Sequence, residues 1–367
     1  MDLGDPRVDQ CIAACESGLK RLLRTRDADV FMYAANGHGA WEAVIANLVG
    51  PGQAVLVAGT GHFSESWAVQ AEALGAQVMR TPYHEGRPID PAAIEAMLRA
   101  DAAVEIVAVF VVHTDTASSV TSDLKAVREA MDRSGHPALL VVDVVASLAA
   151  APFDMDALPA NVALGASQKG LMVPPGLSFV AVDARAMAVA ARNPSPRFYW
   201  DWRLRRHELS YRKFCGTPPQ SLLMGLQAAL TLIFQEGEAA VLARHRLIAQ
   251  AVQAAVDRWS EAGAVRLFAT VPTARSVSVT TVAVAPGIDP EALRTVARDR
   301  FQVAIAGGLG PLAGRAFRIG HLGDMNAARI LGCLAGVEAA MQVQGIPFGR
   351  GGVDRAASVL AASASAA

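Results

Sequence analysis

Short, almost continuous apolar runs alternate with amphipathic segments over residues 8–143 of the chain. The runs are rich in Val, Leu and Ala and predict buried strands, whereas the segments between them repeat apolar residues every three or four positions, as helices do. The predicted strands cover residues 30–33, 54–58, 77–80, 105–112 and 138–143. The predicted helices cover residues 8–25, 40–49, 63–74, 91–100 and 122–133. This alternation is typical of a mostly parallel sheet between helices.

The pattern changes after residue 161. Apolar runs at 162–164 and 177–182 indicate hairpin-like or mixed strands, and two long helical patterns follow at 219–235 and 238–262. The remaining predicted elements are strands near 276–284, 303–306 and 316–319 and helices at 290–299 and 326–344. We therefore expect an α/β fold, with a large domain over residues 1–240 and a smaller C-terminal α+β domain over 241–367. The Ala- and Ser-rich tail after Arg355 is expected to fray.

Composition excludes several classes of protein. With 52% hydrophobic and 18% charged residues, the chain is too apolar to be disordered. The net charge of −1 leaves no basic excess for a nucleic-acid partner. The acidic first residues lack the order of a signal peptide, and the most apolar stretch, 138–153, is too short to span a bilayer. Four cysteines without a CxxC motif indicate neither a disulfide framework nor a metal site. We expect a cytoplasmic globular protein with no membrane partner.

Lysine is rare in this chain, and one lysine is unusual in its surroundings. Of the 33 basic residues, four are lysines: Lys20, Lys125, Lys169 and Lys213. Lys20 and Lys125 fall on amphipathic helices and Lys213 in an arginine-rich stretch, whereas Lys169 lies between two apolar segments. Because loss of water lowers the pKa of an amine, a buried lysine can form a Schiff base. Lys169 is therefore the candidate nucleophile.

Candidate ligand-binding residues follow the predicted strands, where α/β sheets bind their ligands. Gly37 and His38 open a helix, whose first backbone N–H groups can bind a phosphate. Phe63 follows the next strand, and Asp143 closes an apolar one, where an unpaired carboxylate is costly to bury. Taken alone, the glycine-rich turn could be only a turn and Asp143 only a helix cap. With Lys169, these residues meet the needs of pyridoxal phosphate (PLP): a lysine, a phosphate site, a carboxylate for the pyridine nitrogen and a stacking ring.

On these residues and the motifs around them, the chain resembles the class V (fold type I) PLP-dependent aminotransferases, and most of all their serine–glyoxylate and alanine–glyoxylate group. The resemblance extends over nearly the whole chain. It rests on Asn-Gly-His-Gly-Ala-Trp-Glu-Ala from Asn36, Val-Asp-Val-Val-Ala-Ser around Asp143, Ser-Gln-Lys ending at Lys169, and Phe-Arg-Ile-Gly-His-Leu-Gly around Arg318. In addition, His-Thr-Asp-Thr ending at Thr116 is similar to the family's His-x-Glu-Ser/Thr segment.

The resemblance implies roles for single residues. Lys169 would form the Schiff base, Asp143 would face the pyridine nitrogen, and Arg318 would bind the α-carboxylate of the substrate. The other implied cofactor contacts are the backbone of Gly37 and His38 at the phosphate, Phe63 and Val145 on the ring, Thr116 and Gln168 beside the cofactor, and Thr217 at the phosphate of the neighbouring subunit. A homodimer with shared active sites is therefore expected.

The implied reaction is transamination of a small amino acid, serine or alanine, with glyoxylate or pyruvate as the 2-oxo acid acceptor. The chain departs from the family at Asp115, where glutamate is usual, and at Phe214, where an aromatic residue with a hydroxyl is common. One alternative is a PLP-dependent lyase or desulfurase, which would need a mobile cysteine; Cys215 lies near the site, but no glycine-rich loop carries it. Another is a catalytically impaired homologue. The lack of the family's usual Gly- and Pro-rich first segment favours it, and the intact Lys169, Asp143 and Arg318 oppose it.

Overall fold

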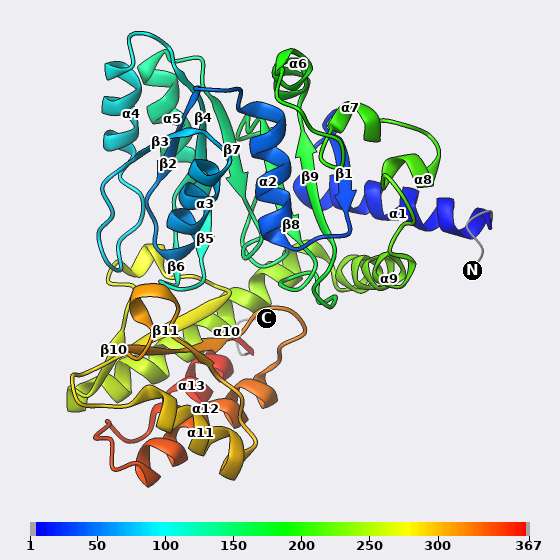
Figure 1. Ribbon diagram of the computed structural model, residues 1–367. Helices are drawn as coiled ribbons and strands as arrows, with labels where there is room; N and C mark the ends of the chain where they lie inside the picture. The colour runs from blue at the N-terminus through cyan, green and yellow to red at the C-terminus, as the bar shows by residue number, and fades with distance from the viewer. Residues whose placement is uncertain (1–4, 365–367) are drawn as a thin grey trace.

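The computed structural model describes residues 5–364 and contains two main sheets, which lie in separate halves of the molecule (Figure 1). The larger sheet has seven strands in the order β1-β9-β8-β7-β4-β2-β3. Their bounds are β1 Asp29–Tyr33, β2 Ala54–Ala58, β3 Gln77–Arg80, β4 Ile106–Val112, β7 Leu139–Asp143, β8 Val162–Ala166 and β9 Ser178–Val182. Only β9 runs antiparallel to its neighbours β1 and β8, so the predicted mostly parallel sheet is confirmed.

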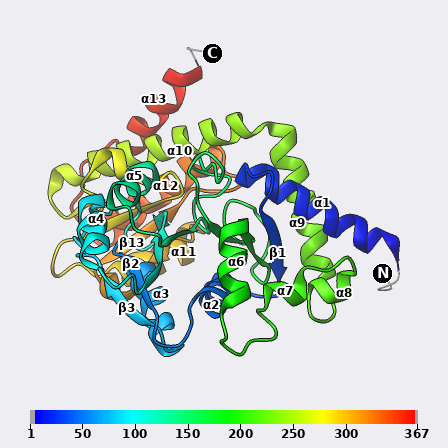
Figure 2. The same ribbon diagram turned by 90° about the horizontal axis from the view of Figure 1, so that it is seen from above.

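Helices cover both faces of this sheet, because alternate residues of each strand point to opposite sides. On β2, for example, Leu56 belongs to the core on one face and Val55 and Val57 to the core on the other. The first core includes α1 Pro6–Leu23, α4 Pro91–Ala100, α5 Leu124–Ser134 and α9 Gln220–Glu236. The second includes α2 Gly37–Leu48, α3 His62–Ala73 and α6 Ala184–Arg192. Figure 2 shows α1 and α9 side by side at one end of the molecule.

The smaller sheet has four antiparallel strands in the order β10-β11-β13-β12. Its strands are β10 Val265–Leu267, β11 Val279–Val284, β12 Ala306–Gly307 and β13 Ala316–Gly320. It shares a third core with α10 Glu238–Trp259, α11 Pro290–Phe301, α12 Ala327–Val343 and α13 Gly352–Ala364. The predicted domain boundary at residue 240 would fall in the first turn of α10, and it stays a prediction.

Short elements connect these parts. They are a two-stranded ribbon of β5 Thr114–Asp115 and β6 Val120–Thr121, the helices α7 Trp202–Arg205 and α8 Ser210–Lys213, and the 3-10 helices η1 Ser260–Ala262, η2 Pro272–Ala274 and η3 Gly310–Leu312. Within residues 5–364, no helix combines the length and the apolar character needed to cross a membrane.

The expectation that the tail after Arg355 frays is wrong for the described residues. Residues 352–364 form α13, which packs against α10 and α12. Ala356 is fully buried in the third core, and Val353 and Leu360 pack against that core. These positions are three and four residues apart, so they share one helix face, and alanine is the best helix former. The Ala-rich composition therefore stabilises a helix here; residues 365–367 lie outside the described part.

Candidate active site

A cavity of about 190 Å³ opens beyond the carboxyl ends of β4 and β7, where α2 and α3 begin. It brings together eight of the predicted site residues: Gly37, His38, Phe63, Thr116, Asp143, Val145, Gln168 and Lys169. They come from five separate stretches of sequence, so the fold assembles in one place what the motifs show one by one. The cavity is also lined by Asn36, Trp41, Val112, Thr114 and Ala146.

One end of the cavity is formed by the first turn of α2. Asn36 is the N-cap, and its side chain accepts a hydrogen bond from the N–H of Gly39 at 3.2 Å. The N–H groups of Gly37 and His38 precede the first intrahelical donor, and the helix dipole makes this end attractive to an anion. A phosphate therefore suits this position.

Gln168 supplies an unused polar atom to the same cavity. Its side-chain Oε1 is buried and has no hydrogen-bond partner within residues 5–364. A buried acceptor without a partner costs free energy, which a donor on a bound group would recover. The predicted cofactor, PLP, carries a hydroxyl group that can donate a hydrogen bond. The unpaired Oε1 of Gln168 therefore fits PLP.

Asp143, the last residue of β7, is 4% exposed and has one donor on each oxygen. Oδ1 accepts the N–H of Val145 at 2.7 Å, and Oδ2 accepts the indole N–H of Trp41 at 2.7 Å. Burial raises the pKa of Asp143 to about 6, against the effect of these two donors. A buried carboxylate of this kind favours a cationic partner, because the opposite charge compensates the lost solvation. The pyridine nitrogen of PLP, once protonated, is such a partner.

Lys169 lies in the turn that follows β8. Burial and the charge of Arg318 lower the pKa of the Lys169 amine, whereas Asp143 opposes this change. A lowered pKa leaves a larger share of the amine neutral near pH 7, and the neutral amine is the form that acts as nucleophile and as base. Glycine is required at the next position, since a Cβ on Gly170 would lie 2.2 Å from the carbonyl oxygen of Leu148.

Arg318 reaches the edge of the cavity from the other sheet. It lies on β13 and donates from Nε to the carbonyl of Gly307 at 2.7 Å and from Nη1 to the carbonyl of Thr116 at 2.9 Å. Arg318 does not line the cavity itself, but Thr116 does. The predicted carboxylate site therefore depends on a contact between the smaller sheet and the turn of the β5–β6 ribbon.

Phe63 is held by the residue that departs from the family pattern. Its backbone N–H donates to Asp115 Oδ2 at 2.8 Å, and Asp115 Oδ1 accepts the N–H groups of Ala117 and Ser118 at 2.8 and 3.1 Å. The N-cap of α3 is Gly61, which has no side chain to cap the helix. Asp115, on β5, caps the helix in place of a Gly61 side chain. Its carboxylate also complements the positive end of the α3 helix dipole.

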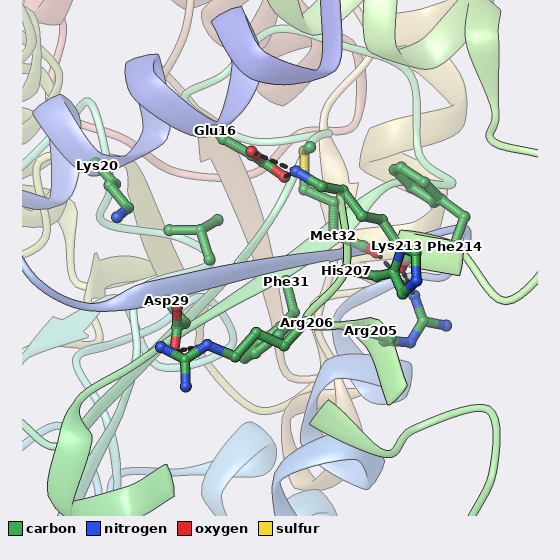
Figure 3. A pocket seen from close by; sticks show the side chains of 11 residues that line it. Glu16, Lys20, Asp29, Phe31, Met32, Arg205, Arg206, His207, Lys213 and Phe214 are labelled. Atoms are coloured by element: carbon green, nitrogen blue, oxygen red, sulfur yellow. Dashed lines mark hydrogen bonds and ion pairs between the residues drawn. The ribbon is translucent and has the colours of Figure 1, made fainter. Parts of the chain in front are cut away.

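Thr217 is the predicted cofactor residue that one chain does not bring to the cavity. It is exposed, and it does not line the cavity; neither does Cys215, the cysteine of the desulfurase alternative. The segment before it is anchored elsewhere: Phe214 is 3% exposed in the first core, and Lys213 pairs with Glu16 of α1 at 2.7 Å. Figure 3 shows Glu16, Lys213 and Phe214 around a second, smaller cavity between α1, β1 and α8.

Trp41 is the site residue that the sequence did not single out. It was visible only as part of the Asn-Gly-His-Gly-Ala-Trp motif. His38 and Trp41 are three residues apart on α2, so they lie on the same face, and their rings are 4.4 Å apart. That spacing was the available signal for a second side chain at the cavity.

Comparisons with known proteins show the family of this chain. The sequence profile of the family described as aminotransferase class-V matches residues 6–313. The chain is 38% identical to the serine–glyoxylate aminotransferase of Methylorubrum extorquens, over 93% of this chain and 85% of that protein. It is 39% identical to the L-aspartate–glyoxylate aminotransferase of Paracoccus denitrificans, over 90% and 83%.

The fold is similar to the crystal structure of pyridoxamine–pyruvate aminotransferase from Mesorhizobium loti. The TM-score is 0.87 at 28% identity, and the match covers 98% of this chain and 91% of that one. The chain therefore belongs to the class V aminotransferases, and its cofactor is pyridoxal phosphate.

Proposed function

We propose that this enzyme transfers the amino group of serine or alanine to glyoxylate or pyruvate. The observation that supports this most is the single cavity in which Lys169, Asp143 and the start of α2 meet, with the Arg318 guanidinium bonded to its rim. Serine–glyoxylate and pyridoxamine–pyruvate aminotransferases are among the similar proteins. We also propose that the enzyme is located in the cytoplasm.

The roles of the residues follow from their positions. The backbone of Gly37 and His38 would hold the phosphate, Phe63 and Val145 would flank the ring, and Thr116 and Gln168 would lie beside it. When bound, PLP supplies the electron sink for the substrate's α-carbon.

Two residues would handle protons. Lys169 would hold the cofactor covalently and, once released by substrate, its Nζ would take the proton from the α-carbon. Asp143 would keep a proton on the ring nitrogen.

Charge near the cavity favours a donor with one carboxylate. Among the described residues that line the cavity, Lys169 is the single Lys or Arg side chain. Arg318 presents a planar guanidinium at the rim, which suits a carboxylate through two parallel hydrogen bonds. The neighbouring Arg294 is already paired with Glu291 and bonded to the carbonyl of Ile305. Within residues 5–364, the basic side chains at the cavity and its rim therefore leave no free cation for a second carboxylate on the donor.

We expect serine and alanine to be better donors to glyoxylate than aspartate and glutamate. Arg318→Lys should raise KM for donor and acceptor alike by about tenfold, because both carry the same carboxylate and lysine cannot form the paired contact. Steady-state rates with each donor measure this. Faster turnover of aspartate or glutamate would contradict the proposed substrate class, and an unchanged KM in Arg318→Lys would contradict the role of Arg318.

The exposed apolar side chains support the homodimer that this proposal includes. Seven of the fourteen large apolar side chains exposed in the described residues fall between positions 198 and 232: Phe198, Tyr199, Leu204, Leu209, Tyr211, Met224 and Leu232. Exposed apolar clusters of this kind mark protein interfaces. Thr217 lies in the same stretch, so a second copy packed here would place this residue in the interface between the two chains.

If the active site is shared between subunits, two variants that each lack one site residue should regain activity when they form a dimer together. Lys169→Ala and Thr217→Ala chains, refolded together, form hybrid dimers with one complete site, which joins Lys169 of one chain to Thr217 of the other. Activity of the mixture should therefore exceed the sum of the separate variants. Thr231→Ala, an exposed threonine on α9, is the matched control and should behave like the parent. An active monomer in sedimentation, or a mixture without gain, would refute the shared site.

A further inference from the structure

The carboxylate of Asp143 is held from two sides by donors of different kinds. Val145 donates from its backbone, which no substitution at that position except proline removes. Trp41 donates from its side chain and comes from α2, 102 positions earlier in the chain. Each carboxylate oxygen can accept two hydrogen bonds, so these donors leave acceptor sites for a group in the cavity.

The ring of Trp41 is fixed by a stack of aromatic side chains. It is 2% exposed and lies 5.4 Å from Trp67 with an angle of 11° between the ring planes. Trp67 in turn stacks on Phe110 at 4.4 Å and 12°. A close-packed indole of this kind keeps one rotamer, so its N–H stays directed at Asp143 Oδ2.

We infer that Trp41 is a positioning residue for Asp143: its indole N–H orients the carboxylate and favours the charged form that the ring nitrogen of PLP requires. This inference rests on the proposed role of Asp143. A hydrogen bond to the ionised form of a carboxyl group stabilises that form. Among the groups that face Asp143, Lys169 also favours the charge, whereas Asp115 opposes it.

Burial already raises the pKa of Asp143 to about 6 with both donors in place. Loss of one donor removes an opposing contribution, so the pKa of the carboxyl group rises further. A neutral Asp143 cannot compensate the charge of a protonated ring nitrogen. The cofactor would then spend more time with that nitrogen unprotonated, and it would be a weaker electron sink.

Trp67 provides a matched control beside Trp41. It is fully buried in the same stack, and its Nε1 has no hydrogen-bond partner within residues 5–364. Trp41→Phe and Trp67→Phe therefore remove the same atoms from neighbouring sites in one core. They differ in whether the lost N–H donates to Asp143.

The test uses holoenzyme loaded with PLP that carries ¹⁵N at the ring nitrogen. In Trp41→Phe, the ¹⁵N shift at pH 7.5 should move toward the unprotonated value, and kcat should fall by about ten- to a hundredfold with little change in donor KM. Trp67→Phe keeps an aromatic ring stacked against Trp41, so it should keep the parent shift and a kcat within about twofold of the parent. Equal behaviour of the two variants would overturn the inference.

A second substitution covers the case in which Trp41→Phe does not fold. Placing 3-benzothienylalanine at position 41 keeps the ring shape and replaces the indole N–H by sulfur. It should give the same ¹⁵N change, and a parent-like shift would again overturn the inference. A parent holoenzyme with an unprotonated ring nitrogen would instead contradict the proposed role of Asp143 itself. The outcome is independent of which amino donor the enzyme uses.

Discussion

Lys169→Ala should lose the covalent attachment of the cofactor and at least about a thousandfold in turnover, because the amine would serve both as nucleophile and as the base at the substrate's α-carbon. Borohydride reduction followed by peptide mapping measures the attachment, and single-turnover rates with serine and glyoxylate measure the second role. The variant should fold, because burial disfavours the charged form of the half-buried Lys169 amine and alanine removes that amine.

Lys125→Ala is the control for Lys169→Ala. The Lys125 side chain is 85% exposed on α5 and lies 3.8 Å from Glu129, so its loss should leave attachment and turnover at the parent level. A reduced cofactor found on Lys20, Lys125 or Lys213 would show that the assignment of Lys169 is wrong.

Asp143→Asn should keep much of the cofactor and lose about a hundredfold or more in turnover. Asparagine retains the shape of the side chain but not the charge that would hold a proton on the ring nitrogen, and fixed charges in buried sites contribute strongly to rate. Asp123→Asn is the control, because Asp123 caps α5 away from the cavity and asparagine caps equally well. A folded, PLP-loaded Asp143→Asn enzyme with parent turnover would contradict the role.

In the absence of cofactor, the difference in stability between the parent and Asp143→Asn should depend on pH. Burial raises the pKa of Asp143 from 3.8 to about 6, so the folded protein binds this proton more tightly than the unfolded chain does. The stability from this group is fully present below about pH 4 and is lost as the pH rises through about 6. The Tm of the parent relative to Asp143→Asn should therefore rise on acidification from pH 7.5 to 5, and a constant difference would contradict the raised pKa.

The first half of the fold was predictable because its signals are local. The strands and helices predicted before residue 145 are all present, with ends displaced by at most three residues. Buried parallel strands read as continuous apolar runs, which the sequence displays directly. The helix α13 was missed because an Ala- and Ser-rich segment indicates a helix only once α10 offers a surface on which Ala356 can be buried.

The cavity was predictable in its members but not in its internal contacts. Lys169 and Asp143 stand out because a charge among apolar residues is unusual in any sequence. The partners of these residues are set by tertiary packing: the donation from Trp41 to Asp143, the capping of α3 by Asp115 and the bond from Arg318 to Thr116 join positions 102, 52 and 202 residues apart. No local pattern records such pairs.

Arg318 links substrate recognition to the packing of the smaller sheet against the β5–β6 ribbon. Two of its N–H donors already serve the carbonyls of Gly307 and Thr116, and the guanidinium has five in all. A carboxylate that takes donors still free leaves this bridge intact, whereas one that competes for the same donors weakens it. The free energy of substrate binding and the free energy of packing the smaller sheet on the β5–β6 ribbon are therefore coupled at this side chain, and the coupling is reciprocal. A substitution at position 318 that suits a new amino-acid substrate would at the same time change the contact between the smaller sheet and the β5–β6 ribbon.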